Sequence, residues 1–213
     1  CTSGRCHGAA RGKDGFGLSL YGFDPKGDYF RLTQEIPGRR VNLARPESSL
    51  ILTKATGTAP HSGGERFTAD SDFHKTLERW VAEGAREDKP DVAQPTGMRI
   101  FPPQAVLSGK GRTQQLVIVA EYSDGASRDV TDLATFISNN DNSAAVSESG
   151  LIESGARGEA FVMARFDSFT EGIPVIALSG DADMTMQNAE VANYIDEHVN
   201  RKLRKLLIRP SQV

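Results

Sequence analysis

The stretch Leu116-Val-Ile-Val-Ala-Glu-Tyr122, which runs into Ser123-Asp-Gly125, predicts a β-strand that ends in a tight turn. Residues 160–166 and 173–178 have the same short, apolar and β-branched character. Turn residues recur between such stretches at a spacing of about 8–12 residues, which is typical of an all-β sandwich. We therefore expect residues 97–180 to form an antiparallel β-sandwich.

Residues 1–87 have a different pattern, in which short helical segments alternate with glycine-rich loops. Helices are expected at residues 28–36, 46–54 and 71–84. Asp70 or Ser71 would cap the last helix and Gly84 would close it. Large apolar residues are few, so we expect a group other than the chain to fill the core of this small all-α domain. A linker rich in proline and charge follows at residues 88–96.

Residues 181–213 are expected to hold a linker and one amphipathic helix of a following domain. The helix carries five apolar residues at helical spacing, namely Val191, Ile195, Val199, Leu203 and Leu206. An exposed stripe of this kind marks an interface. We expect the stripe to contact a downstream domain or another copy of the chain, with docking onto the sandwich as the alternative.

The overall composition limits the classes of partner. The 213 residues carry 25 basic and 28 acidic side chains, for a net charge of −3. There is no basic excess for binding nucleic acid, and no apolar stretch is long enough for a transmembrane segment. Both cysteines lie near the start, which argues against a disulfide-stapled domain. Because the chain begins at Cys1 without an initiator methionine, we interpret it as a processed or partial product.

The first seven residues, Cys1-Thr-Ser-Gly-Arg-Cys6-His7, place two thiols and an imidazole close together. In the motif C-x-x-C-H, two cysteines attach a haem covalently and the histidine binds its iron. The spacing here is C-x4-C-H, so the loop between the thiols would have to bulge. We expect one covalent haem c, held by Cys1, Cys6 and His7. The alternatives are a local disulfide, a lipid-modified Cys1 and a mixed Cys/His zinc site.

A second axial ligand has to come from elsewhere, because no methionine precedes Met98. His61 lies in a loop rich in proline and glycine, where the backbone can approach a flat group closely. His74 lies within an expected helix and is interpreted as a partly exposed surface residue. We therefore favour His7 and His61 as the metal ligands, with an open or water-bound iron as the remaining alternative.

Three arginines, Arg39, Arg40 and Arg66, are candidates for binding the haem propionates, because a guanidinium forks onto a carboxylate. The alternative for each is a solvated loop residue. No spacing of a nucleophile, a base and a carboxylate suggests a catalytic site, so no enzyme activity is expected. The Asp and Asn residues of the sandwich loops are interpreted as turn formers rather than as calcium ligands.

Several motifs of the first 87 residues occur in the order found in one family. They are C-x4-C-H-G, Gly38-Arg-Arg-Val-Asn42, Ser49-Leu-Ile-Leu-Thr-Lys54, Pro60-His-Ser-Gly-Gly-Glu-Arg-Phe67 and Trp80-Val-Ala-Glu-Gly-Ala85. On these motifs the domain resembles the planctomycete-type cytochrome c domain. The resemblance implies a module that passes electrons to a redox partner protein.

Residues 97–180 resemble the bacterial Ig-like domain of group 2, on Tyr122-Ser-Asp-Gly, Arg128-Asp-Val-Thr131 and Gly150-Leu-Ile, with Phe136 at the usual tryptophan position. The last helix is similar to the start of a further domain in large planctomycete surface or periplasmic proteins. Together these resemblances imply an electron-transfer module joined to an Ig-like spacer, in the periplasm or at the cell surface or extracellular. The alternative is a surface adhesion or structural protein, in which the Ig-like domain binds a glycan or protein and haem is structural.

Overall fold

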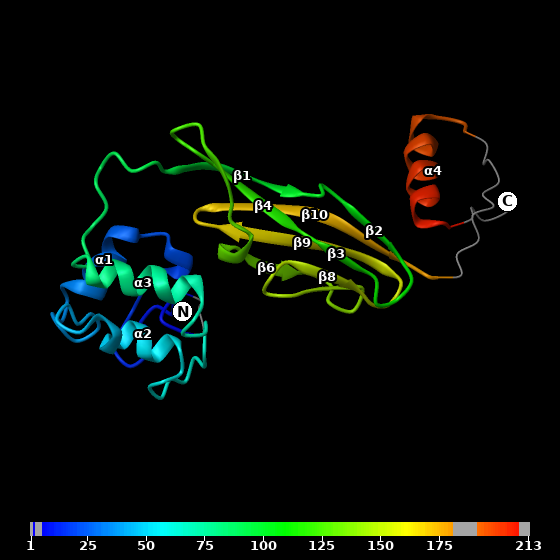
Figure 1. The fold of residues 1–213 in the computed structure, drawn as a ribbon. Helices are drawn as coiled ribbons and strands as arrows, with labels where there is room; N and C mark the ends of the chain where they lie inside the picture. The colour runs from blue at the N-terminus through cyan, green and yellow to red at the C-terminus, as the bar shows by residue number, and fades with distance from the viewer. Residues whose placement is uncertain (1, 3–5, 181–190, 209–213) are drawn as a thin grey trace. The chain divides into compact units, whose positions relative to one another are not determined.

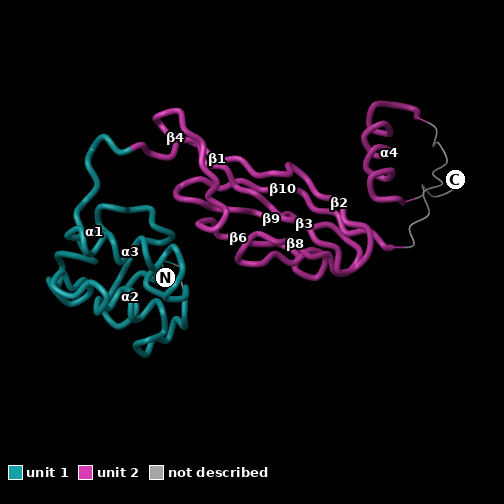
Figure 2. The backbone as a smooth tube through the Cα atoms, in the orientation of Figure 1, with its two compact units in different colours: residues 1–92 teal, residues 93–213 magenta. Residues whose placement is uncertain are grey.

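A computed structural model describes Thr2, residues 6–180 and residues 191–208. The chain divides into two compact units, Cys1–Val92 and Ala93–Val213, which are coloured separately in Figure 2. None of the described helices is both long and apolar enough to cross a membrane. Of the linker and helix predicted at 181–213, residues 181–190 and 209–213 lie outside the described residues.

The first unit is made of short helices joined by long loops (Figure 1). Its elements are η1 (Leu20–Gly22), α1 (Pro25–Thr33), η2 (Pro46–Ser48), α2 (Leu50–Ala55) and α3 (Asp72–Ala82). The described residues of this unit contain no β-strand beyond an isolated bridge between Lys13 and Phe16. Its helical character therefore agrees with the sequence prediction, whereas its predicted likeness to a cytochrome is not shown by the fold.

Two of the predicted helices differ from the observed ones. Helix α1 starts earlier than predicted, at Pro25, because Asp24 Oδ1 accepts a hydrogen bond from the backbone of Gly27 at 3.0 Å and Pro25 suits the first position. The helix predicted at 46–54 is interrupted by Ser49, whose backbone is extended and whose hydroxyl accepts from the backbone of Asn42 at 3.0 Å. A buried serine that satisfies a loop in this way separates η2 from α2.

Helix α3 begins where the sequence predicts. The hydroxyl of Ser71 accepts a hydrogen bond from the backbone of His74 at 3.2 Å, which confirms Ser71 as the cap. The helix buries Val81 completely, in a small cluster with Val41 and Ala85. Few buried apolar side chains therefore hold this unit together.

The second unit contains a β-sandwich (Figure 1). Its strands are β1 (Pro95–Phe101), β2 (Ala105–Ser108), β3 (Thr113–Gln115), β4 (Val117–Tyr122), β5 (Ser127–Asp129), β6 (Thr135–Ser138), β7 (Ala144–Val146), β8 (Leu151–Ser154), β9 (Gly158–Phe166) and β10 (Phe169–Leu178). They form sheets of order β1-β4-β5, β2-β10-β9-β6 and β3-β8-β7. The predicted sandwich is thus confirmed.

Alternating side chains form the core of the sandwich. Ile118 and Ala120 of β4 are fully buried, as are Val162 and Ala164 of β9, and each pair is separated by one residue of the opposite face. One expectation is wrong: the sheets are not wholly antiparallel, because β2 runs parallel to β10. A period-two pattern reports which face of a strand is buried but not the direction of its neighbour, so the sequence could not show this pair.

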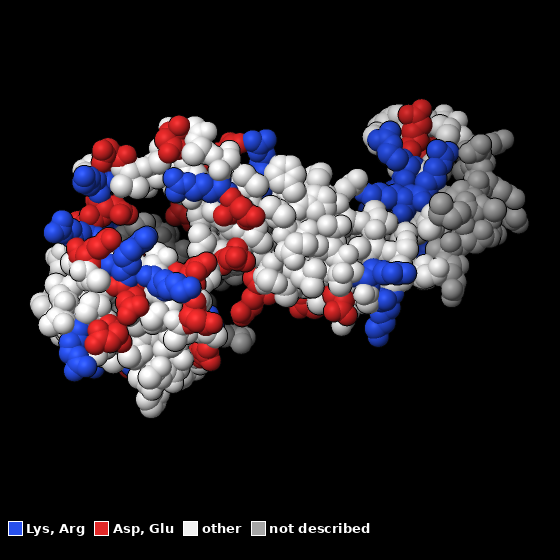
Figure 3. All heavy atoms as spheres, in the orientation of Figure 1, with Lys and Arg blue, Asp and Glu red and all other residues white. Residues whose placement is uncertain are grey.

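Helix α4 (Tyr194–Leu206) follows the gap in the described residues. Asn193 caps it in a capping box with Asp196, which satisfies backbone N–H groups of the first turn. Figure 3 shows basic side chains gathered over this helix, where the sequence holds Arg201, Lys202, Arg204 and Lys205.

Hydrogen bonds join α4 to the sandwich. Lys202 Nζ donates to the carboxylate of Glu159, and Lys205 Nζ donates to Gln104 Oε1 at 2.6 Å. The apolar side chains near the start of the helix, Val191, Tyr194, Ile195 and Val199, are exposed. The predicted partner of this stripe stays a prediction.

Candidate cofactor-binding site

A cavity of about 730 Å³ opens in the first unit. Its walls come from the loop before η1, from α1, from the loop that leads to Arg40, from α2 and from the loop that carries His61. The apolar part of the lining includes Phe16, Leu18, Leu32, Ile36, Leu50 and Ile51. Because these residues surround the space instead of filling it, the cavity has the size and character of a small-molecule or cofactor site.

His7 and His61 both line this cavity, and their rings are nearly parallel. Their ring centroids are 6.1 Å apart and their planes differ by only 8°. His7 Nδ1 lies 2.8 Å from the carbonyl oxygen of Phe16, and His61 Nδ1 lies 3.3 Å from the carbonyl oxygen of Gly64. Since carbonyl oxygens only accept, each ring donates from Nδ1, and each keeps Nε2 for another interaction.

Cys6 also lines the cavity, as a half-buried free thiol next to His7. Cys1, the other predicted attachment point, lies outside the described residues. The structure therefore shows the Cys6-His7 half of the sequence motif at the cavity wall.

His74, the competing candidate, does not line the cavity. It lies in α3, where its ring meets Phe67 edge-on with centroids 6.4 Å apart. Its Nδ1 is buried, makes no hydrogen bond within the described part of the chain, and lies 3.8 Å from Glu78 Oε2. The preference for His61 over His74 agrees with these positions, while the ligand role of His61 stays a prediction.

The three arginines predicted to bind propionates have different surroundings. Arg39 lines the cavity. Arg40 also lines it, but the Arg40 side chain is only 8% exposed and its guanidinium contacts Glu35 at 2.8 Å and the carbonyl of Arg31 at 2.7 Å. Arg66 is not part of the lining and donates to the carbonyl of Gly63. The propionate-binding role of Arg39 stays a prediction.

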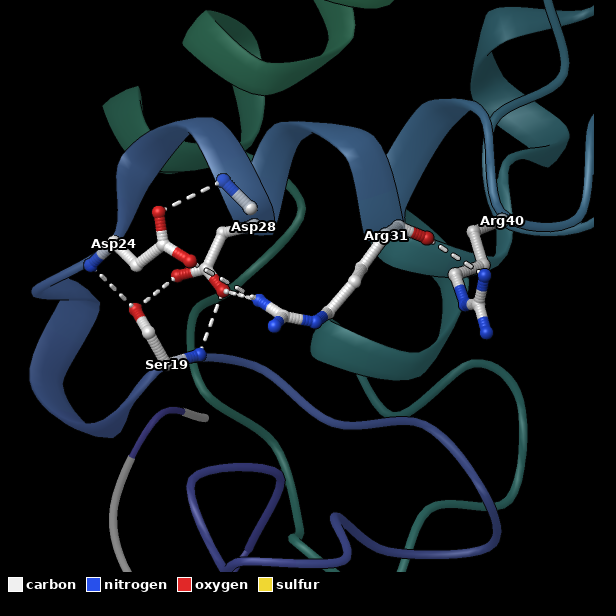
Figure 4. A network of polar contacts seen from close by, with 6 residues as sticks. Ser19, Asp24, Asp28, Arg31 and Arg40 are labelled. Atoms are coloured by element: carbon white, nitrogen blue, oxygen red, sulfur yellow. Dashed lines mark hydrogen bonds and ion pairs between the residues drawn. The ribbon is translucent and has the colours of Figure 1, made fainter.

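A polar network lies next to Arg40 at the cavity wall (Figure 4). The hydroxyl of Ser19 donates to Asp28 Oδ2 at 2.6 Å, and Arg31 Nη1 donates to Asp28 Oδ1 at 3.2 Å. The hydroxyl of Ser19 in turn accepts from the backbone of Asp24 at 3.0 Å. Through the carbonyl of Arg31, this network connects α1 and the loop at Ser19 to Arg40.

Several lining residues were missed by the sequence reasoning, above all Phe16. Asp14 and Gly15 both have positive φ, of 55° and 75°, and form a tight turn that returns the chain from Lys13 to Phe16. An Asp-Gly pair is a strong signal for such a turn. The stretch Lys13-Asp-Gly-Phe16 could therefore have indicated that Phe16 folds back onto the preceding loop.

The polar loops of the sandwich act as turns, as expected. Asp124 Oδ1 accepts from the backbone of Ala126 at 2.9 Å, and Asn139 Oδ1 accepts from the backbone of Phe161 at 2.7 Å. Hydrogen bonds from the hydroxyl and the backbone of Thr131 lower the pKa of Asp129. These oxygens are committed to backbone and hydroxyl donors.

Comparisons with known proteins add little to this site. No protein-family model and no curated protein matches the chain. Among solved structures, domains 4 and 5 of the S-layer protein SbsC align with a TM-score of 0.36 and 14% identity, over 40% of this chain and 53% of that chain. Domains 5–6 of SbsC give 0.36 and 13%, over 48% and 52%.

A GH10 xylanase from termite gut that contains a bacterial Ig-like domain aligns with a TM-score of 0.26 and 11% identity, over 35% of this chain and 18% of that chain. The present chain thus spans about half or less of each of these structures. None of them is a cytochrome.

The predicted classification as a metal-binding cytochrome is corrected by these findings. Within residues 6–180 and 191–208, no three or more His, Cys, Asp or Glu side chains are grouped so that they could hold a metal ion. The described side chains alone therefore form no metal site. A haem iron draws most of its ligands from the macrocycle and at most two from the protein, so the cofactor prediction is a separate question.

Proposed function

We propose that this chain belongs to a surface or extracellular protein in which the first unit holds one covalently attached haem and the Ig-like sandwich is a structural or interaction domain. The observation that carries the haem proposal is the parallel pair of imidazoles, His7 and His61, in the lining of a cavity that Cys6 also lines. The surface assignment is supported by the sandwich, an architecture shared by many cell-surface domains.

The cavity fits a haem in three respects. Its volume of about 730 Å³ lies within the range of cofactor sites. An imidazole nitrogen binds a metal at about 2.0–2.1 Å, so two imidazoles that would each bind one ion through a ring nitrogen need centroids no more than about 6 Å apart. The observed separation is 6.1 Å. The apolar walls at Phe16, Leu18 and Leu32 also suit a flat, largely hydrophobic macrocycle.

Each residue of the site would have a distinct task. Cys6 would form a thioether link, and His7 and His61 would each offer Nε2 to the iron. Arg39 would bind a carboxylate at the cavity mouth through paired hydrogen bonds. The bound group would supply an iron that can change its oxidation state by one electron. The apolar walls would exclude water from it.

The small core of the helical unit favours a structural role for the haem. Val41, Val81 and Ala85 form the buried cluster of the helical unit, so a buried macrocycle would supply much of the missing apolar contact.

Electron transfer is the second candidate, and the parallel imidazoles favour it over chemistry on a substrate, because they would leave no open coordination position. A reversible redox titration of the loaded chain separates the two roles. A haem that neither takes up nor releases an electron reversibly would leave the structural role alone.

The haem proposal is tested with the whole chain, produced in a host that attaches haem to exported proteins. After denaturation, we expect a haem-stained band and a mass increase of one haem for the natural sequence. Cys6→Ser should lower the yield of attached haem strongly, whereas Ser123→Ala, in a turn of the sandwich, should not. A natural chain that carries no added mass after denaturation would sink the proposal.

A further inference from the structure

Each imidazole of the parallel pair is held by a loop, and each loop is held by an arginine. The two arginines, Arg40 and Arg66, were predicted from the sequence to bind propionates. Their contacts in the structure are instead with the protein itself. We infer that Arg40 and Arg66 are positioning residues that set the angle between the rings of His7 and His61; the inference rests on the proposed haem function.

The first support concerns His7. The guanidinium of Arg40 lies over the ring of Phe16, 4.1 Å from its centroid. Phe16 contacts His7 twice, through its carbonyl oxygen at 2.8 Å from Nδ1 and through its ring, whose centroid is 4.7 Å from that of the imidazole. Arg40 therefore fixes the residue that sets both the tilt and the proton position of His7.

Arg40 is itself held in place. Its planar fork donates to the carbonyl of Arg31 and pairs with Glu35, and the Arg31 side chain is bound to Asp28 in the network of Figure 4. A lysine at this position would keep the charge but could not make these contacts in one plane while stacking on Phe16. We therefore expect Arg40→Lys to rotate the ring of His7 although the positive charge is kept.

The second support concerns His61. Arg66 donates to the carbonyl of Gly63, which closes the loop that carries His61. Gly63 packs so tightly beneath the ring that an added methyl group would lie 2.8 Å from Cε1 of His61. The backbone of Arg66 is anchored to Ala55, the last residue of α2, by a hydrogen bond of 2.7 Å. The side chain of Arg66 thus links the loop to a fixed point.

The test measures the ring angle itself, on the ferric, haem-loaded whole chain by low-temperature electron paramagnetic resonance. The anisotropy of this signal depends on the angle between two axial imidazole planes, and the observed 8° predicts the rhombic spectrum of parallel rings. Arg40→Lys and Arg66→Lys should lose that spectrum in favour of a more anisotropic low-spin signal or a high-spin fraction. Arg45→Lys, at a side chain 73% exposed and remote from the cavity lining, is the matched control and should keep it.

Two further variants keep the test decisive if Arg40→Lys does not fold. Phe16→Leu removes the ring beneath the guanidinium but keeps the backbone carbonyl, and Gly63→Ala displaces His61 directly. Both should shift the spectrum, while Gly17→Ala, whose methyl group would meet only atoms 3.8 Å away, should not. Spectra identical to that of the natural chain in both arginine variants would overturn the positioning roles alone, and if Arg40→Lys does not fold, an unchanged spectrum of Phe16→Leu would overturn the role of Arg40. A natural chain without attached haem would overturn the proposed function, and the inference with it.

Discussion

At the scale of single residues, the carbonyl oxygen of Phe16 determines the chemistry of His7. It lies 2.8 Å from Nδ1 and can only accept a hydrogen bond, so the proton of the neutral ring stays on Nδ1 and Nε2 keeps its lone pair. A histidine oriented in this way by a second hydrogen bond is a better ligand than a free one. The sequence shows His7 but not this partner, which lies nine residues further along the chain.

We predict that His61→Ala opens a coordination position in the haem-loaded chain, because one of the two rings is removed while His7 and Cys6 are kept. The absorption spectrum should change from six-coordinate low-spin to high-spin, and the ferrous form should then bind carbon monoxide readily. His74→Ala is the control, since His74 lies in α3 away from the cavity lining. Loss of the low-spin spectrum in the control variant, and not in His61→Ala, would exchange the two assignments.

A second prediction at this scale concerns Asp129 of the sandwich. Hydrogen bonds from the hydroxyl and the backbone of Thr131 hold its pKa below the ordinary value, so its charged form stabilises the fold above a pH of about 3.9. This contribution is lost as the pH falls through the lowered pKa. Because the site is exposed, Asp129→Asn should reduce the free energy of unfolding by only about 0.5 kcal/mol at neutral pH.

Urea unfolding at a series of pH values checks this expectation. The difference between the natural chain and Asp129→Asn should be constant near neutral pH and should disappear in strong acid. Asp141→Asn, at another exposed loop position, is the control. A difference for Asp129→Asn that persists at the lowest pH would show that shape, and not charge, is responsible.

At the scale of elements, the helix α3 (Asp72–Ala82) depends on its first hydrogen bond. Ser71→Ala removes the acceptor for the backbone N–H of His74 and should lower the free energy of unfolding of the first unit by about 1 kcal/mol. The chain has one tryptophan, Trp80, which lies in this helix, so its fluorescence reports the transition directly. Lys75→Ala, at a side chain 64% exposed, should change stability by less than about 0.5 kcal/mol. Equal losses in both variants would argue against a capping effect.

The sequence predicts elements well where one physical signal dominates. The alternation of apolar and polar residues correctly predicted the strands β4 and β9, and a serine followed by apolar residues at helical spacing correctly predicted α3. The sequence did not predict features that depend on a contact between distant residues or on a local irregularity of the backbone. The parallel pair β2 and β10 joins strands far apart in the chain, and the break at Ser49 depends on a hydrogen bond with Asn42.

The candidate site was predictable only in part for a similar reason. His7 and His61 stand out because imidazoles are few, with four in the chain. Arg40 and Arg66 were predicted as propionate partners because a guanidinium forks onto a carboxylate, whereas the positioning roles inferred here depend on contacts with Phe16 and Gly63, residues without charge. Side chains that position others carry no chemical signature in a sequence, so three-dimensional contacts are needed to find them.

At the scale of the whole molecule, the two units differ in how much core they bury. Among the described residues, the sandwich has one cluster of fifteen buried apolar side chains, whereas the cluster of the helical unit has three, Val41, Val81 and Ala85. The helical unit also contains the cavity of about 730 Å³. Because a small unit has little stability to spare, an unfilled space of this size should be costly.

We therefore predict that the units depend differently on the cofactor. A fragment of residues 93–180 should fold cooperatively without any ligand, because its core is complete. A fragment of residues 1–92 prepared without haem should show little helix by circular dichroism and no cooperative thermal transition. The same fragment with attached haem should show both, since a bound group stabilises the folded state that binds it. A haem-free helical fragment that unfolds in a sharp transition would show that its loops and the Ser19–Asp28–Arg31 network hold the fold without the macrocycle.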